Sequence, residues 1–150
     1  MRHGHSPSTA EAKVKTDAER PLSEQGEKDI AKIAGYLQKS SVQLQAIFTS
    51  PLLRAVETAV LLASVLNPAS GIKKLPALSG QSSPSDLWRA LERTLGNTPS
   101  APIALVGHYP QVGKFVTWLT KNHAPSFLPG TCVALEHQKN KTQLLWSRDP

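Results

Sequence analysis

The chain has 150 residues, a mass of 16.2 kDa and 39% hydrophobic residues, which fit one domain over residues 1–150 with a continuous core. A net charge of +6 favours anionic partners, but the basic residues are scattered and only 5% of residues are aromatic, which argues against nucleic acid. With no apolar stretch near the roughly 20 residues that span a bilayer, no signal-peptide pattern and one cysteine, we expect a cytoplasmic protein without membrane partners.

The first half of the chain predicts a loop, a helix, a strand and a second helix. Residues 6–21 lack a sustained apolar period, which is typical of a long loop. Apolar residues recur at helical spacing over residues 23–40, with Ser23 as the N-cap. Residues 45–49 predict a short strand, and residues 51–67 predict a helix with proline at its first position.

The second half continues the alternation of strands and helices. Residues 86–95 predict a short amphipathic helix, and residues 102–106 predict a buried strand. A turn at residues 107–110 leads into a further helix. Residues 131–135 and 142–146 predict a closing hairpin around the polar segment at residues 136–141. This order predicts a three-layer α/β sandwich, with a mostly parallel central sheet flanked by helices.

Candidate polar side chains occur in three groups, one at the start of the first loop and two after predicted strands. His3 stands at the start of the first loop, Ser50 and Arg54 follow the strand at residues 45–49, and His108 follows the strand that ends at Val106. Ligands of parallel sheets bind beyond the carboxyl ends of the strands, so we expect these side chains to meet there.

The residue types at this edge suit phosphoryl transfer. A neutral imidazole, with a pKa of about 6.5, is an effective nucleophile toward phosphorus, and His3 could therefore form a phosphohistidine. The guanidinium groups of Arg2 and Arg54 could hold the phosphoryl oxygens, and His108 could donate a further hydrogen bond. Taken singly, the arginines could instead lie on a solvated face and His108 within a turn.

Four sequence blocks occur in one order over nearly the whole chain. They are Arg2-His3-Gly4; Arg20-Pro21-Leu22-Ser23 with Gly26; Ser50-Pro51-Leu52-Leu53-Arg54-Ala55 with Glu57-Thr58; and Gly107-His108 followed by Pro110, Val112 and Gly113. In these blocks the chain resembles the histidine phosphatase superfamily, branch 1, whose fold is phosphoglycerate mutase-like. It is most similar to the short SixA-type phosphohistidine phosphatases.

The resemblance implies a site and a partner. The implied residues are a nucleophilic His3, a phosphate pocket of Arg2, Arg54, His108 and Gly4, and supporting roles for Arg20 and Ser50. No metal and no organic cofactor are implied. The implied partner is a phosphohistidine protein of a signalling relay, such as a histidine phosphotransfer domain, and the pocket is expected to take phosphate or phosphate-mimicking anions.

The chain differs from the family pattern in its acids. Larger members of the superfamily place a glutamate general acid after the third strand, whereas residues 76–80 contain no carboxylate. General acid catalysis is commonly worth about 10²–10⁴-fold, and an alkoxide leaving group depends on it more than the imidazole of phosphohistidine. This favours phosphohistidine as substrate, although Asp17, Glu19 or Asp86 could still reach the site.

The N-terminal block also differs, because only Met1 precedes Arg2-His3-Gly4 and the first strand is therefore expected to be truncated. His5 is interpreted as a residue of the pocket rim, since no further ligand cluster completes a metal site with it. Two alternatives stay open beside the phosphohistidine phosphatase. They are a small-molecule phosphomonoesterase of the same superfamily and a non-catalytic phosphoprotein-binding module.

Overall fold

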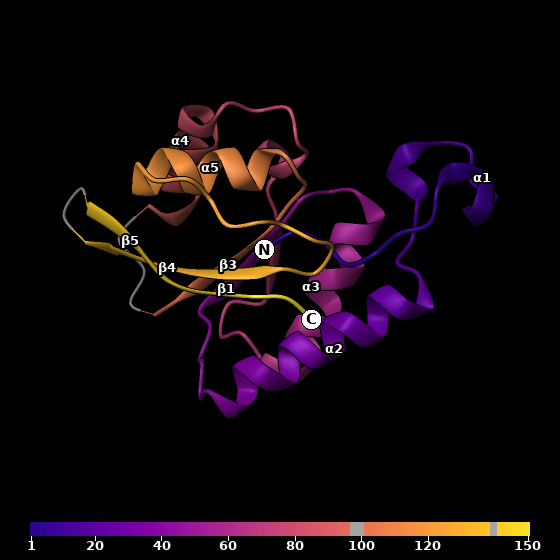
Figure 1. Cartoon of the computed structure of the whole chain (residues 1–150), viewed down its shortest axis with the longest axis horizontal. Coiled ribbons are helices and arrows are strands. Elements are labelled where there is room, and N and C mark those ends of the chain that lie inside the picture. Colours follow the sequence, from indigo (N-terminus) through magenta and orange to yellow (C-terminus); the bar gives the residue numbers. More distant parts are fainter. Residues whose placement is uncertain (97–100, 139–140) are drawn as a thin grey trace.

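Three parallel strands lie at the centre of the protein, in the order β2, β1, β3 (Figure 1). The computed structural model describes residues 1–96, 101–138 and 141–150. The strands of the sheet are β1 (Ala46–Thr49), β2 (Ile72–Lys74) and β3 (Ile103–Val106). The helices are α1 (Thr9–Ala12), α2 (Glu24–Lys39), α3 (Leu53–Leu66), α4 (Pro84–Leu95) and α5 (Gln111–Thr120). Figure 1 shows α2 and α3 on one side of the strands and α4 and α5 on the other, which is the expected three-layer α/β architecture.

The alternation of side chains along β1 divides the core into two parts. All four residues of β1 are buried, as expected for a central parallel strand. Ile47 belongs to the cluster formed with α2 and α3, which includes Ile30 and Leu62. Phe48, which points to the opposite face, packs in the cluster formed with α4 and α5. One short strand thus joins both helical layers and fixes the position of the residues that follow it.

The N-terminal residues lie beside β3 as a minimal strand. Arg2 forms a parallel bridge with Gly107, and the Met1 amino group donates to the carbonyl oxygen of Leu105 at 2.6 Å. On the other side, the Arg2 N–H donates to the Thr131 carbonyl oxygen at 3.1 Å. This N-terminal segment is therefore held between β3 and the residues before β4, and it places His3 at the end of the sheet.

The C-terminal segment forms the expected antiparallel hairpin, and both strands are longer than expected. The hairpin consists of β4 (Cys132–Gln138) and β5 (Lys141–Arg148), with an irregularity at residues 134–135. The connection at residues 139–140, part of the predicted polar segment, lies outside the described residues. None of the helices in the described part of the chain has the length and apolar character needed to cross a membrane.

Several sequence expectations about local structure need correction. The predicted loop at residues 6–21 contains α1 and a 3-10 turn at Asp17–Glu19, because capping boxes at Ser8 and Thr16 stabilise these turns without an apolar period. Helix α3 begins after Pro51 rather than at it, and Leu52 is its N-cap. Strand β2 was not expected, because its three residues are exposed and two of them are lysines.

Helix α4 begins two residues earlier than expected. Ser83 caps it by accepting a hydrogen bond from the Asp86 N–H at 3.2 Å, and Pro84 takes the first helical position. Proline is well suited to that position because its missing N–H would have no helical partner there. The remaining boundaries of the predicted helices and strands agree with the structure within a few residues.

Candidate active site

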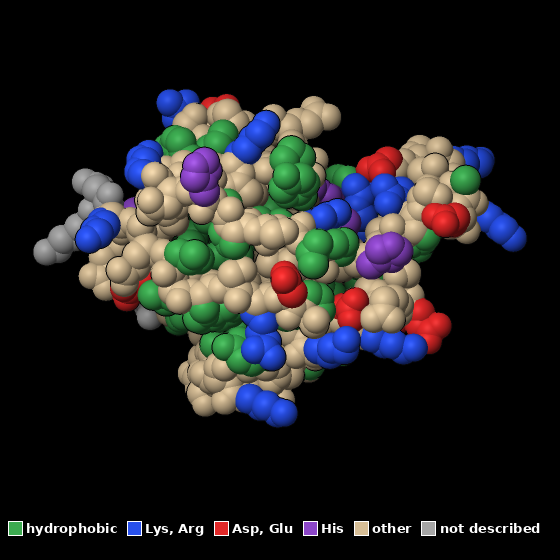
Figure 2. All heavy atoms as spheres, viewed as in Figure 1, with side chains coloured by type: hydrophobic (Ala, Val, Ile, Leu, Met, Phe, Trp, Pro, Cys, Tyr) green, Lys and Arg blue, Asp and Glu red, His purple; other side chains and the backbone are tan. Residues whose placement is uncertain are grey.

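A cavity of about 340 Å³ opens where β1 and β3 end. It is lined by Arg2, His3, Asp17, Arg20, Leu52, Arg54, Ser79, Gly80, Gln81, His108 and Tyr109. Figure 2 shows Lys or Arg side chains and His side chains gathered between α5 and the protruding segment that carries α1. The chain thus brings together five of the predicted residues, whereas Gly4 and Ser50 stand behind the lining.

The environment of His3 fixes the proton on its ring. Its Nδ1 lies 2.7 Å from the Gly4 carbonyl oxygen, which can only accept a hydrogen bond, so Nδ1 carries the hydrogen. Its Nε2 accepts a hydrogen bond from the Arg54 Nε at 3.3 Å. Burial lowers the pKa of His3 to about 3, and the positive charges of Arg54 and Arg2 act in the same direction. His3 is therefore neutral near pH 7, with its lone pair on Nε2.

Arg54 is buried in the first turn of α3, and Asp17 occupies its outer edge. The Arg54 Nη1 donates to the Asp17 carbonyl oxygen at 2.7 Å, and Nη2 donates to the Asp17 carboxylate at 2.9 Å. In this state, the guanidinium edge that suits a phosphoryl group is bound to a carboxylate of the same chain.

Asp17 itself is held by a second arginine. The Arg20 Nη1 donates to the Asp17 carboxylate at 2.8 Å, while the Arg20 Nε and Nη2 donate to the carbonyl oxygens of Pro7 and Ser6. The hydrogen bonds from Arg20 and then Arg54 lower the pKa of Asp17, although its partial burial opposes them. Asp17 is therefore a carboxylate at neutral pH, and Arg20 ties the α1 segment to the cavity.

His108 lies opposite His3, with 4.9 Å between the ring centroids. Its Nε2 is 2.8 Å from the Ser50 hydroxyl, which holds the ring from behind. Burial is the largest cause that lowers the pKa of His108 to about 4, followed by the charge of Arg54. Ser50 is in turn fixed at the end of β1, because its N–H donates to the Val106 carbonyl oxygen. Ser50 thus orients His108 without lining the cavity.

Arg2 joins the cavity to the neighbouring surface. Its Nη1 donates to the Phe127 carbonyl oxygen at 2.8 Å, and its guanidinium carbon is 5.8 Å from the ring centroid of Tyr109. Its Nε is buried without a hydrogen-bond partner among the described residues. Burial also lowers the pKa of Arg2, but the reference value is so high that the side chain stays charged.

Gly4 is packed too tightly to carry a side chain. A Cβ atom on Gly4 would lie 2.9 Å from a side-chain carbon of Ile30 and 3.1 Å from the Gly26 carbonyl oxygen. The Gly4 N–H donates to the Thr58 hydroxyl at 3.1 Å, and Gly4 does not line the cavity. In this structure, Gly4 positions His3 against α2 and α3, and its N–H is already bonded.

Sequence analysis missed the loop at residues 79–81, which forms one wall of the cavity, and Gln111, which holds it. The buried Gln111 side chain accepts from the Gly80 N–H at 3.1 Å and donates to the carbonyl oxygens of Ala77 and Ser82. The available indication was a glutamine at the first residue of α5, on the same side as the apolar residues of this helix that are buried. Gly80, with φ of 102°, adopts a backbone conformation that suits glycine.

The other polar residues considered from the sequence lie elsewhere. Glu19 bonds to Thr16, Asp86 bonds to Ser83, and neither lines the cavity. His5 bonds to Ser23 and is also absent from the lining, so its expected place at the pocket rim is not observed. Within the described residues, no group of three His, Cys, Asp or Glu side chains has an arrangement that could hold a metal ion.

A family model and two related sequences match this chain. The family model of the histidine phosphatase superfamily (branch 1) matches residues 1–81. An uncharacterized protein of Picosynechococcus sp. is 36% identical over 116 residues, covering 77% of this chain and 67% of that protein. The phosphohistidine phosphatase SixA of Escherichia coli (strain K12) is 28% identical over 153 residues, covering 100% of this chain and 91% of that protein.

Solved structures agree with the fold. SixA in complex with tungstate superposes with a TM-score of 0.87 at 24% identity, over 99% of this chain and 94% of that one. A SixA-like protein from Agrobacterium tumefaciens gives a TM-score of 0.79 at 17% identity, over 99% and 94% of the two chains. Both likenesses support the expected SixA-type, phosphoglycerate mutase-like fold. The family-model match over more than half of the sequence, together with these relatives, shows that the chain belongs to the histidine phosphatase superfamily (branch 1).

Proposed function

We propose that this protein is a phosphohistidine phosphatase in which the Nε2 atom of His3 attacks the phosphorus. The observation that carries the proposal is the fixed tautomer of His3, with Nδ1–H bonded to Gly4 and the lone pair of Nε2 beside Arg54. No strong base is needed, because the lowered pKa of His3 already leaves the ring neutral at neutral pH.

Charge in the cavity supports an anionic substrate. Arg2, Arg20 and Arg54 line it against a single acid, Asp17, among the described lining residues. A bound phosphoryl group would replace the Asp17 carboxylate at Arg54, forming forked hydrogen bonds of the same kind. Arg2 and His108 would contact the remaining oxygens, where charge increases in the transition state.

The lack of a proton donor on Asp17 indicates which kind of leaving group suits the cavity. Asp17 is ionised and bonded to two arginines, so it has no proton to donate at neutral pH. In a phosphohistidine substrate, the P–N bond breaks as the His3 Nε2–P bond forms. The substrate imidazole takes the P–N electron pair and, protonated by solvent at its other ring nitrogen, leaves as neutral imidazole. This step needs no enzymatic acid, whereas an ester would have to release an alkoxide.

Water completes the reaction. It attacks the phosphorus of phospho-His3, the Nε2–P bond breaks, and inorganic phosphate leaves with the water oxygen. His3 returns to its neutral form, with its hydrogen still on Nδ1. The names of the relatives agree with such chemistry, since one is a phosphohistidine phosphatase and another was solved with tungstate, a phosphate-like oxyanion. The substrate is thus expected to be a protein that carries phosphohistidine, with a histidine phosphotransfer domain as the first choice.

The test compares two substrate classes on one enzyme preparation. We expect release of phosphate from a phosphohistidine protein at a kcat/KM at least about 10²-fold above that for sugar phosphate esters, the scale of a missing general acid. His3→Ala is expected to abolish both activities. Efficient turnover of the esters alone would identify a small-molecule phosphomonoesterase. Phosphate-dependent binding of the phosphoprotein without turnover would identify a binding module.

A further inference from the structure

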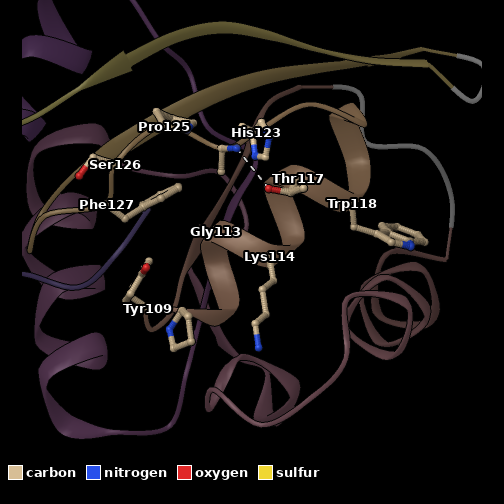
Figure 3. Close-up of a pocket in the computed structure, with 11 residues that line it drawn as sticks. Tyr109, Gly113, Lys114, Thr117, Trp118, His123, Pro125, Ser126 and Phe127 are labelled. Atoms are coloured by element: carbon tan, nitrogen blue, oxygen red, sulfur yellow. Dashed lines mark hydrogen bonds between the residues drawn. The ribbon is translucent and has the colours of Figure 1, made fainter.

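A groove of about 810 Å³ lies next to the active-site cavity and has no part in the proposed chemistry. One wall is α5, and the other is the segment that follows it (Figure 3). The lining consists of Tyr109, Pro110, Gly113, Lys114, Thr117, Trp118, His123, Ala124, Pro125, Ser126 and Phe127. The Ala124 N–H donates to the Thr117 hydroxyl at 3.2 Å, which fastens the second wall to the helix.

The groove combines aromatic surfaces with positive charge. Figure 3 shows Tyr109 and Phe127 at one end and Trp118 at the other, with Lys114 between them in this view. The lining contains no Asp or Glu, and neither Lys114 nor His123 forms an ion pair with the described residues. Lys121 adds a further cation, 5.1 Å from the ring centroid of Trp118. This surface complements a segment that carries both acidic and apolar side chains.

The groove floor is open next to the active site because Gly113 has no side chain. A Cβ atom there would lie 3.7 Å from the Tyr109 ring and 3.8 Å from the Phe127 ring. Figure 3 places both rings on the same side of Gly113. These are ordinary van der Waals distances, so the missing side chain at Gly113 leaves room for a methyl-sized group in contact with both rings.

The groove and the cavity adjoin each other at Tyr109. Tyr109 lines both, with 59% of its surface exposed. The Phe127 carbonyl oxygen accepts the hydrogen bond from Arg2 that holds this arginine in the cavity. A chain lying in the groove therefore adjoins the phosphate position and contacts the residues that orient Arg2.

We propose that this groove binds the segment of the substrate protein next to its phosphohistidine, and that an acidic and apolar segment is preferred. The inference rests on the proposed function for the identity of the bound protein. Charge complementarity at Lys114 and continuity through Tyr109 are the observations that favour this partner over a second copy of this basic chain.

Two phosphohistidine peptides of equal length test the proposal. One carries Glu and Leu beside the phosphohistidine, and the other carries Lys in place of Glu. Phosphoramidate, which has a P–N bond and no flanking chain, serves as the reference substrate. The kcat/KM of each peptide is divided by that of phosphoramidate. In wild type we expect this ratio to be about fivefold higher for the Glu peptide than for the Lys peptide, which is the scale of a partly exposed ion pair. The preference should decrease as salt increases.

A negative charge added to the groove should reverse this preference. Lys114→Glu and, separately, His123→Glu change exposed side chains, and we expect both variants to favour the Lys peptide. The control matched to Lys114→Glu is Lys39→Glu on α2, which makes the same charge change in the opposite helical layer and should keep the wild-type preference. A wild type without preference, or a Lys114→Glu variant with the same preference as Lys39→Glu, would overturn the proposal.

Binding separates this inference from the proposed function. Fluorescence anisotropy of the labelled, unphosphorylated Glu peptide measures occupancy of the groove without any turnover. Weaker binding by Lys114→Glu than by Lys39→Glu supports peptide binding in the groove, whether or not the substrates are cleaved. If neither phosphoramidate nor the peptides are cleaved, the proposed phosphatase activity alone is rejected. If phosphoramidate and both peptides are cleaved at equal rates and peptide binding does not depend on charge, the proposed role of the groove alone is rejected.

Discussion

Gly26→Ala is the substitution whose effect the structure specifies most sharply. Gly26 lies in the first turn of α2, where it packs against the backbone of His5, two residues after the proposed nucleophile. A Cβ atom there would lie 2.9 Å from the His5 nitrogen and closer still to the His5 carbonyl oxygen. Real Cβ atoms do not come so close, so His5 and its neighbours must move.

The backbone at His5 has little freedom to move. Its carbonyl oxygen accepts from the Ser23 N–H at 2.9 Å, and its side chain bonds to the Ser23 hydroxyl at 2.8 Å. Alanine gains about 1 kcal/mol of helix propensity over glycine, but overpacking costs typically about 1–3 kcal/mol and more against rigid backbone. We therefore expect a net loss of about 1–2 kcal/mol in the free energy of unfolding. Turnover should fall too, because a shift at His5 displaces the Gly4 carbonyl oxygen that orients His3.

Gly35→Ala is the matched control in the same helix. A Cβ atom on Gly35 would have no atom within 4 Å apart from its chain neighbours and the backbone of its own helix, so only the gain in propensity remains. We expect this variant to be more stable than wild type by about 0.5–1 kcal/mol, with unchanged turnover. Urea unfolding of the three proteins measures both effects. A Gly26→Ala protein as stable as Gly35→Ala would refute the close packing of the His3 loop on α2.

Three further predictions concern the cavity. Asp17→Asn removes the carboxylate that competes for Arg54, so vanadate should bind about two- to fivefold more tightly, as calorimetry can measure; weaker binding would show that Asp17 assists anion binding instead. Ser50→Ala leaves the Nε2 atom of His108 without its hydrogen-bond partner, so kcat/KM should fall about tenfold. An unchanged kcat/KM would exclude the role of Ser50 in orienting His108. His3 and His108 have folded-state pKa values of about 3 and about 4, below an unfolded value of about 6.5, so the unfolded chain binds more protons and stability is lost as pH falls below about 6.5. Each histidine contributes up to about 1.4 kcal/mol per pH unit between pH 6.5 and 5, and urea unfolding that is independent of pH there would contradict the burial of the neutral rings.

The layered fold was predictable because the spacing of apolar residues and the order of strands and helices along the chain both indicate it. The spacing of Ile30, Ile33 and Leu37 identified α2, and all three are buried as expected. The place of His3, Arg54 and His108 after strands predicted their convergence, since parallel strands end at one edge of the sheet. The spacing of apolar residues within a helix and the order of the elements can be read from the sequence, so these features could be inferred without a structure.

Elements held by polar contacts were harder to predict. Helix α1 and the turn at Asp17–Glu19 depend on capping boxes and on Arg20, so no apolar pattern indicates them. The bond between Asp17 and Arg54 joins residues 37 positions apart, and nothing in the sequence pairs that aspartate with that arginine. The groove beside α5 likewise depends on how the chain folds back after the helix, which side-chain periodicity does not report.

A quenched-flow search for a phosphoenzyme shows whether His3 is the nucleophile. The protein is mixed with a ³²P-labelled phosphohistidine peptide, the reaction is stopped in alkali, and the acid-labile label on the chain is located by peptide mapping. We expect a transient label on His3 that is absent in His3→Ala and retained in His5→Ala, because His5 lies outside the cavity lining. Release of phosphate at full rate by His3→Ala, or a label on His108 in its place, would contradict this expectation.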